Sequence, residues 1–157
     1  MKKRVLVTRK LLKENEEKLK ELFDVKLNIH DELYTSEKIL ELSKDCDGIL
    51  SAITDQINKD LIEKLSPTVK IIANFAVGFG NIDINAATKK NIVVTNTPEV
   101  LDDSTADISI LLLLGASRKV LEARRAAELQ NWKWAADFIL GKQMSNKRLG
   151  ILGMGRI

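Results

Sequence analysis

Residues 70–95 have the sequence KIIANFAVGFGNIDINAATKKNIVVT, which contains the clearest alternation of strand and helix patterns in the chain. Lys70–Asn74 is a short aliphatic run without helical periodicity, which predicts a buried strand. A loop with two glycines follows, and Asp83 is a good N-cap for a short helix over Ile84–Lys90. Ile92–Thr95 is rich in β-branched residues and predicts the next strand. A strand, a helix and a strand with short connections indicate a parallel βαβ unit.

The same alternation extends back to the amino terminus. Short β-forming runs predict three earlier strands, and apolar residues spaced three and four positions apart predict three earlier helices. The expected strands are Val5–Val7, Val25–Ile29 and Gly48–Ser51, and the expected helices contain Leu12–Phe23, Ile39–Leu42 and Leu61–Leu65. Ser36 and Asn58 are the expected caps of the second and third helices. The pattern predicts an α/β fold, a flavodoxin-like doubly wound parallel sheet with helices on both faces.

After Pro98 the pattern changes to one long helix. Ser104–Asp107 has capping-box spacing, and the helix is expected to run to about Leu129. Its first half is apolar nearly all round, so we expect that half to be buried between layers. We therefore divide the chain into residues 1–100, a flavodoxin-like domain, and residues 101–157, a linker helix, an arm and the start of a second domain.

The last residues begin a dinucleotide-binding pattern. Arg148–Leu152 predicts a sixth strand, which runs directly into Gly153-Met-Gly-Arg-Ile157. In G-x-G-x-x-G, the first glycine permits a tight turn and the second lets the backbone approach a pyrophosphate. The third glycine would come after Ile157, so we expect a truncated Rossmann domain. Because the neighbours of the sixth strand are absent, the tail is not expected to form a cofactor pocket.

Composition excludes several classes of protein. The chain has 157 residues with 25 Lys+Arg and 22 Asp+Glu, a net charge of +3 that does not indicate nucleic-acid binding. The longest apolar run, Ile108–Ala116, is far short of the roughly 20 residues that a membrane span needs. A lone Cys46 and a lone His30 fit a cytoplasmic protein without a structural metal. His30 is expected to be a surface histidine or a polar residue with its hydrogen bonds satisfied.

A second glycine-containing loop, Ala76–Asn81, follows the strand at Lys70–Asn74. Ligands of open α/β sheets bind at the carboxyl ends of strands, and small residues there expose backbone N–H groups that could hold a carboxylate. The alternative is a plain turn that requires a positive φ angle at Gly78 or Gly80. Both interpretations remain open at this point.

A resemblance that runs in order over essentially the whole chain is clearest in four segments, Asn74–Asp83, Ala86–Pro98, Val100–Asp107 and Leu149–Ile157. The combination of Val-Thr-Asn-Thr-Pro with Thr-Ala-Asp is specific. Together they resemble the D-isomer-specific 2-hydroxyacid dehydrogenases, most closely the glyoxylate/hydroxypyruvate reductases. The resemblance implies a substrate-side domain built from both ends of the chain, and a middle domain that binds NAD or NADP. These residues resemble the amino-terminal half of such an enzyme.

The resemblance also implies roles for residues of this chain. Val77 and Gly78 would bind the substrate carboxylate through backbone amides. The implied cofactor-binding residues are Thr105, Gly153, Gly155, Arg156 and Ile157. For Thr105 a cap position is the alternative, and Asp83 is kept as a cap. Relatives usually carry Asp where this chain has Gly80, which makes this loop more flexible.

The implied activity is hydride transfer between nicotinamide and a small 2-oxo acid such as glyoxylate. The family's catalytic Arg, Glu and His lie after the glycine loop, so no catalytic residue is assigned, and His30 cannot replace that His. We therefore expect a polypeptide of these 157 residues to be inactive by itself. Arg118–Gly141 resembles the arm through which family members dimerise. The choice between NAD and NADP depends on a group about 20 residues past the glycine loop.

Two other interpretations remain open. The chain could be a module that binds a small carboxylate at Val77–Gly78 without redox chemistry, or a structural dimerisation fragment.

Overall fold

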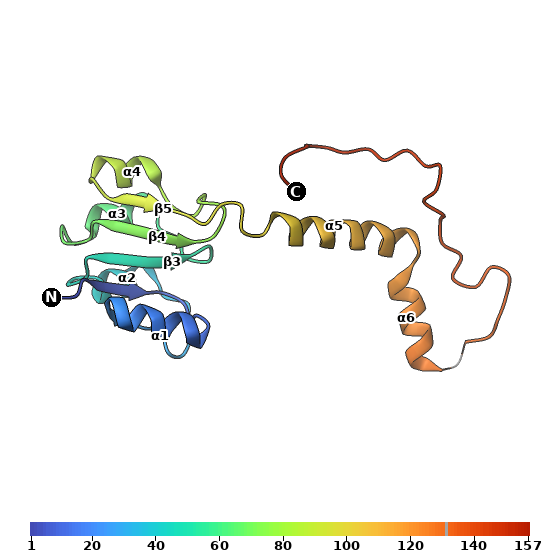
Figure 1. The fold of residues 1–157 in the computed structure, drawn as a ribbon, viewed down its shortest axis with the longest axis horizontal. Coiled ribbons are helices and arrows are strands. Elements are labelled where there is room, and N and C mark those ends of the chain that lie inside the picture. Colours follow the sequence, from blue (N-terminus) through green and yellow to red (C-terminus); the bar gives the residue numbers. More distant parts are fainter. Residues whose placement is uncertain (131) are drawn as a thin grey trace. The chain divides into compact units, whose positions relative to one another are not determined.

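The computed structural model describes residues 1–130 and 132–157, which form two compact units, Met1–Val100 and Leu101–Ile157. The first unit contains a five-stranded parallel sheet in the order β2-β1-β3-β4-β5 (Figure 1). This is the flavodoxin-like, doubly wound order, so the predicted fold is confirmed. The strands are β1 (Arg4–Val7), β2 (Asp24–Lys26), β3 (Gly48–Ala52), β4 (Ile71–Phe75) and β5 (Val93–Thr95), and the helices are α1 (Lys13–Leu22), α2 (Ser36–Leu42), α3 (Lys59–Lys64) and α4 (Ile84–Lys89).

The core of the first unit lies between the sheet and helices α2, α3 and α4, which contact one another in that order. Figure 1 shows α1 on the near face of the sheet and α2 and α3 on the far face. Strand residues Leu6, Ile49 and Ile72 and helix residues Ile39 and Ile62 are at most 1% exposed. Burying each aliphatic side chain contributes about 1.5–3 kcal/mol to folding, which makes this side of the sheet the rigid base of the unit.

Side-chain caps fix where three helices begin. Asn58 caps α3 and Asp83 caps α4, as predicted. The cap of α2 is Thr35 instead of the predicted Ser36, because Thr35 holds the extended backbone (φ −75°, ψ 164°) from which its hydroxyl accepts the Lys38 N–H at 3.3 Å.

Strand β2 is shorter than the predicted Val25–Ile29. Asn28 leaves the ladder because its side-chain amide bonds elsewhere: Nδ2 donates to the Thr8 carbonyl at 2.8 Å and to the Glu32 carbonyl at 2.7 Å. The side-chain oxygen of Asn28 also accepts the Glu32 N–H at 3.1 Å, which closes a local turn.

The second unit has two helices, α5 (Asp102–Ser117) and α6 (Val120–Leu129). The prediction of one helix to Leu129 is wrong, because Lys119 adopts a left-handed backbone (φ 54°) that an α-helix cannot continue through. The expectation that the apolar first half is buried is also wrong: Leu111 and Leu112 are 61% and 65% exposed. The unit provides no sheet against which α5 could pack within its described residues. No helix in the described part of the chain is long and apolar enough to cross a membrane.

Residues 132–157 contain neither helix nor strand. The predicted sixth strand at Arg148–Leu152 is therefore wrong for this structure, in which that segment is irregular and exposed. A parallel strand must exchange hydrogen bonds with a neighbouring strand, and the described residues of the second unit include none.

Candidate functional site

The 76–81 loop (Ala76–Asn81) connects the carboxyl end of β4 to α4. Val77 in this loop is half-buried, whereas Gly78 and Phe79 are exposed. The backbone N–H groups of these three residues donate no hydrogen bond to any other residue that the structure describes. The loop therefore presents three adjacent free donors, which is the arrangement that a carboxylate can use.

The carbonyl groups of the first three loop residues, Ala76, Val77 and Gly78, each accept a hydrogen bond. Their donors come from the end of β4 and from the residues after β5, so the loop is tied to two parts of the sheet. The Thr97 N–H donates to the Ala76 carbonyl at 2.9 Å, Nδ2 of Asn96 to the Val77 carbonyl at 2.7 Å, and Nδ2 of Asn74 to the Gly78 carbonyl at 2.9 Å.

The two glycines of the loop are not explained by backbone strain. Neither Gly78 nor Gly80 has a positive φ angle, so the alternative of a turn that requires one is wrong. A Cβ atom built on either glycine would meet nothing within 4 Å. The missing side chains leave open space beside the free N–H groups, which fits a site that a ligand approaches closely.

A buried polar layer lies beneath the loop, at the carboxyl ends of β1, β3 and β4. Oγ of Ser51 donates to Oδ1 of Asn74 at 3.0 Å, and Asn74 in turn bonds to Asn81. Asp55 accepts hydrogen bonds from the Thr8 hydroxyl and from the Ala52 N–H. All the polar side chains of this layer are buried, so the layer holds the loop on a fixed base. Apart from Asn74 standing in an apolar strand, the sequence carried no signal for it.

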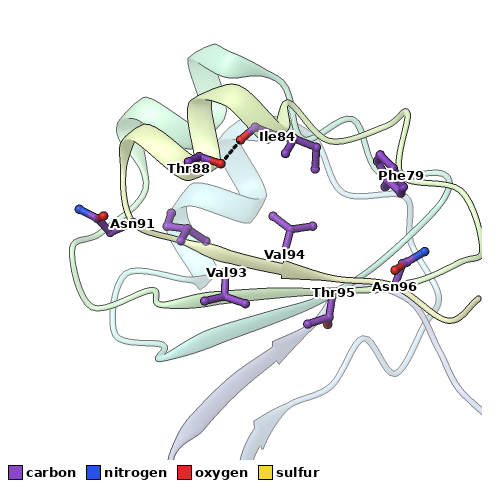
Figure 2. Close-up of a pocket in the computed structure, with 9 residues that line it drawn as sticks. Phe79, Ile84, Thr88, Asn91, Val93, Val94, Thr95 and Asn96 are labelled. Atoms are coloured by element: carbon purple, nitrogen blue, oxygen red, sulfur yellow. Dashed lines mark hydrogen bonds between the residues drawn. The ribbon is translucent and has the colours of Figure 1, made fainter.

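A cavity of about 610 Å³ lies between α4 and the edge strand β5. Figure 2 shows the side chains of Val94 and Val93 on opposite sides of β5, with Val94 on the side of α4, and both residues line the cavity. Phe79 and Asn96 belong both to its lining and to the surroundings of the 76–81 loop. Since no titratable side chain lines the cavity, it can accept an uncharged group but cannot transfer protons.

The predicted cofactor residues are not assembled into a site. Oγ1 of Thr105, in the first turn of α5, donates to the Leu101 carbonyl at 2.8 Å; Thr105 is therefore not the N-cap residue itself. Gly153, Gly155, Arg156 and Ile157 lie in an exposed, irregular segment, in which Gly153 has a φ angle of 85°. The described residues directly before Gly153 contain no strand, so these residues do not form the strand–turn–helix cradle that a dinucleotide requires.

The predicted arm, Arg118–Gly141, contains α6 and both tryptophans; its residue Asn131 lies outside the described residues. The rings of Trp132 and Phe138 stack with centroids 5.7 Å apart. Trp134 is 82% exposed. All three aromatic side chains are exposed, which leaves apolar area on the second unit.

The titratable groups of the first unit include ion pairs and a buried thiol but no catalytic cluster among the described residues. His30 is exposed, and burial raises the pKa of the Cys46 thiol. Hydrogen bonds from Lys26 and Arg4 lower the pKa of Asp45 to about 2, and the Arg9 guanidinium holds the pKa of Asp31 well below its usual range. These are ion pairs at the sheet ends. Within the described residues, no group of three His, Cys, Asp or Glu side chains could hold a metal ion.

Comparison with known proteins adds a family relationship to this geometry. Residues 5–147 match the family model of the D-isomer specific 2-hydroxyacid dehydrogenase catalytic domain. The chain is 44% identical to a glyoxylate reductase of Korarchaeum cryptofilum, over 100% of this chain and 48% of that protein.

Solved structures of 2-hydroxyacid dehydrogenases and related reductases are also similar to this chain. A D-isomer specific 2-hydroxyacid dehydrogenase from Polaromonas superimposes with a TM-score of 0.90 at 34% identity, over 99% of this chain and 49% of that chain. A glyoxylate/hydroxypyruvate reductase from Sinorhizobium meliloti, solved with NADP and malonate, has a TM-score of 0.77 at 27% identity, over 99% of this chain and 47% of that chain. The chain thus spans about half the length of the relatives it matches.

Proposed function

The chain belongs to the D-isomer specific 2-hydroxyacid dehydrogenase family, and from this premise we propose that the full-length protein reduces a small 2-oxo acid, glyoxylate or hydroxypyruvate, to the D-2-hydroxy acid. The proposed reductant is NADH or NADPH. In this proposal the first unit binds the substrate carboxylate, and Leu101–Ile157 is the beginning of the dinucleotide-binding domain.

One observation carries the substrate assignment: the free N–H groups of Val77 and Gly78 at the carboxyl end of a central strand. N–H donors fixed by a folded backbone can bind a carboxylate without the burial of a counter-charge. Gly78 leaves space for the ligand to approach, since a Cβ there would contact nothing within 4 Å. That a related reductase was solved with malonate, a dicarboxylate, agrees with a carboxylate site in this family.

The direct test is reduction of glyoxylate and hydroxypyruvate by the full-length protein, followed as loss of NADH or NADPH absorbance. We expect turnover with at least one of the two cofactors. Failure with both cofactors, in a folded protein that still binds oxalate in calorimetry, would favour the alternative of a non-catalytic carboxylate-binding module.

A polypeptide restricted to residues 1–157 is proposed to be inactive by itself. Its single histidine, His30, is exposed and remote in sequence from the 76–81 loop, and Gly153–Ile157 form no cradle for the cofactor. Measurable reduction of glyoxylate by this polypeptide would contradict the proposal.

We also propose that the full-length protein is a homodimer through Arg118–Gly141. The support is the exposure of large apolar side chains there, including Trp134 at 82% and Leu129 at 69%. Light scattering of the Trp134→Glu variant tests this: the variant is expected to shift towards monomer, whereas the surface control Lys18→Glu on α1 is not.

A further inference from the structure

We propose that Asn74 and Asn96 are positioning residues, which hold the carbonyl groups of the 76–81 loop away from the ligand so that the N–H groups of Gly78 and Phe79 face it. The inference rests on the proposed function for its choice of ligand, a small carboxylate. It adds Phe79 to the donors and gives two asparagine side chains a role in affinity.

The argument starts from the planarity of the peptide group. In a trans peptide the C=O and N–H bonds point to opposite sides, so the direction of a carbonyl fixes the direction of the next residue's N–H. Nδ2 of Asn96 donates to the Val77 carbonyl at 2.7 Å, which turns the Gly78 N–H away from Asn96. Nδ2 of Asn74 donates to the Gly78 carbonyl at 2.9 Å, which turns the Phe79 N–H away from Asn74.

These two hydrogen bonds matter because glycine offers no resistance of its own to peptide rotation. A residue without Cβ can rotate its flanking peptides over a wide range, and Gly78 and Gly80 both stand in open space. If the Val77–Gly78 peptide turned over, a carbonyl oxygen would replace the N–H and repel a carboxylate. The asparagines supply the rigidity that the glycines lack.

The two asparagines differ in how firmly they are held. Asn74 is 2% exposed, and its side-chain oxygen accepts hydrogen bonds from Ser51 and Asn81, so its orientation is fixed on every side. Asn96 follows β5 and is half-buried, and Figure 2 shows it at the end of the strand. Among the described residues, its side chain makes one hydrogen bond, to the Val77 carbonyl. Asn96 can therefore be changed with less risk to folding.

The kinetic test uses Asn96→Ala and Asn96→Asp in the full-length protein, since neither side chain can donate to the Val77 carbonyl. Without Asn96 the Gly78 N–H should no longer be held towards the substrate carboxylate. We expect KM for glyoxylate to rise about tenfold or more, the effect typical of a lost hydrogen bond to a charged group, with kcat changed by less than about threefold. The KM for the nicotinamide cofactor should stay unchanged. Asn85→Ala is the matched control, because Asn85 is an exposed asparagine on α4 without a side-chain hydrogen bond to the described residues.

A second readout does not depend on turnover. Val77–Gly78 is the only Val–Gly pair in these 157 residues, so ¹³C-carbonyl valine with ¹⁵N-glycine selects the Gly78 amide in an NMR spectrum. Oxalate should shift this signal in the wild-type protein, and at least tenfold more oxalate should be needed in Asn96→Ala. Asn74→Asp keeps the oxygen that accepts from Ser51 and Asn81 but loses the donor to the Gly78 carbonyl. With ¹³C-carbonyl glycine and ¹⁵N-phenylalanine, which select the Phe79 amide, this variant should likewise need at least tenfold more oxalate.

The outcomes separate this inference from the proposed function. Turnover of glyoxylate with no oxalate-induced shift at Gly78, or with unchanged KM in both Asn96 variants, would overturn the positioning role and leave the reductase proposal intact. Oxalate binding that depends on Asn96 in a protein without reductase activity would support the positioning role and overturn the reductase proposal. A rise in KM and a fall in kcat of equal size in the Asn96 variants, together with a lowered unfolding temperature, would overturn the positioning role and show a merely structural one.

Discussion

Asn74 and Asn81 exchange two hydrogen bonds through their side-chain amides: Nδ2 of Asn74 donates to Oδ1 of Asn81 at 3.0 Å, and Nδ2 of Asn81 donates to Oδ1 of Asn74 at 3.3 Å. Nδ2 of Asn81 also lies 3.1 Å from the Ala52 carbonyl and 3.0 Å from the Asp55 carbonyl. One NH₂ group thus faces three oxygen atoms. The pair joins the end of β4 to the far end of the 76–81 loop, so the loop is closed on itself by buried side chains.

Replacing Asn81 with Asp tests this arrangement. The substitution puts a carboxylate oxygen against three other oxygens in a buried site, and we expect it to destabilise the fold by at least about 3 kcal/mol near pH 7. Burial and the surrounding oxygens would raise the pKa of the new carboxyl group, because both disfavour its charged form. The folded state then binds more protons than the unfolded state, so the loss of stability should shrink as the pH falls.

Urea unfolding at pH 5 and pH 8 measures this effect. Asn81→Ala is the control: it removes the same donors without adding a charge, so we expect a loss of about 1–3 kcal/mol that is equal at both pH values. Equal losses at both pH values in Asn81→Asp would contradict the three-oxygen environment.

Gly78→Ala is expected to separate binding from stability. The added Cβ would meet no atom within 4 Å, and the backbone at Gly78 has no positive φ, so the free energy of unfolding should stay within about 0.5 kcal/mol or rise slightly. The same methyl group would stand beside the free N–H, and KM for glyoxylate should increase. Thermal unfolding measures the expected stability, and steady-state kinetics measure the expected increase in KM. A destabilised variant with unchanged KM would argue against a ligand site here.

Gly48→Ala, unlike Gly78→Ala, is expected to destabilise the fold. Its Cβ would lie 2.8 Å from Cγ2 of Ile71 on the neighbouring strand β4, closer than real side chains approach. We expect a loss of about 1–3 kcal/mol in unfolding free energy. The double variant with Ile71→Ala, which removes Cγ2, should recover part of that loss in a double-mutant cycle. Additive losses in the cycle would show that the contact is not the cause.

Much of this fold could be predicted from the sequence because each short strand and helix has its own periodicity and cap. Asp83 and Asn58 cap the helices as predicted, and the five strands lie where β-forming residues cluster. The strand order is the common flavodoxin-like one, which repeated βαβ units with right-handed crossovers favour. These features are local or general, so a single sequence carries them.

The features that the sequence did not reveal depend on contacts between distant residues. Asn96 reaches the Val77 carbonyl across 19 positions, and no pattern marks it as more than a polar residue after a strand. Lys119 interrupts the predicted helix although lysine is a good helix former, and Arg148–Leu152 has the composition of a strand but no neighbour to pair with. The composition of a segment indicates which secondary structure it favours, but a strand forms only where a neighbouring strand can pair with it.

The ion pairs at the sheet ends predict an acid-dependent contribution to stability. Lys26 and Arg4 lower the pKa of Asp45 to about 2 from the model-peptide value of 3.8. Because the folded-state pKa is the lower one, this contribution is present above about pH 4 and is lost as the pH falls towards 2. Asp45→Asn should therefore flatten the decline of stability between pH 4 and pH 2 relative to the wild type. Urea midpoints at these pH values measure it, and added salt should reduce the difference because Asp45 is half exposed.

His30→Gln tests whether proton transfer depends on any histidine of these 157 residues, since His30 is the only one. The side chain is exposed after β2 and makes no hydrogen bond to the described residues, so it has nothing to orient it towards the 76–81 loop. We expect kcat of the full-length protein and its dependence on pH to remain unchanged. A general acid–base histidine contributes about 10²–10⁴-fold to the rate, so a loss of that size would place the proton transfer in the first unit. It would also remove the reason for expecting residues 1–157 to be inactive alone, because that expectation depends on the acid–base group lying elsewhere.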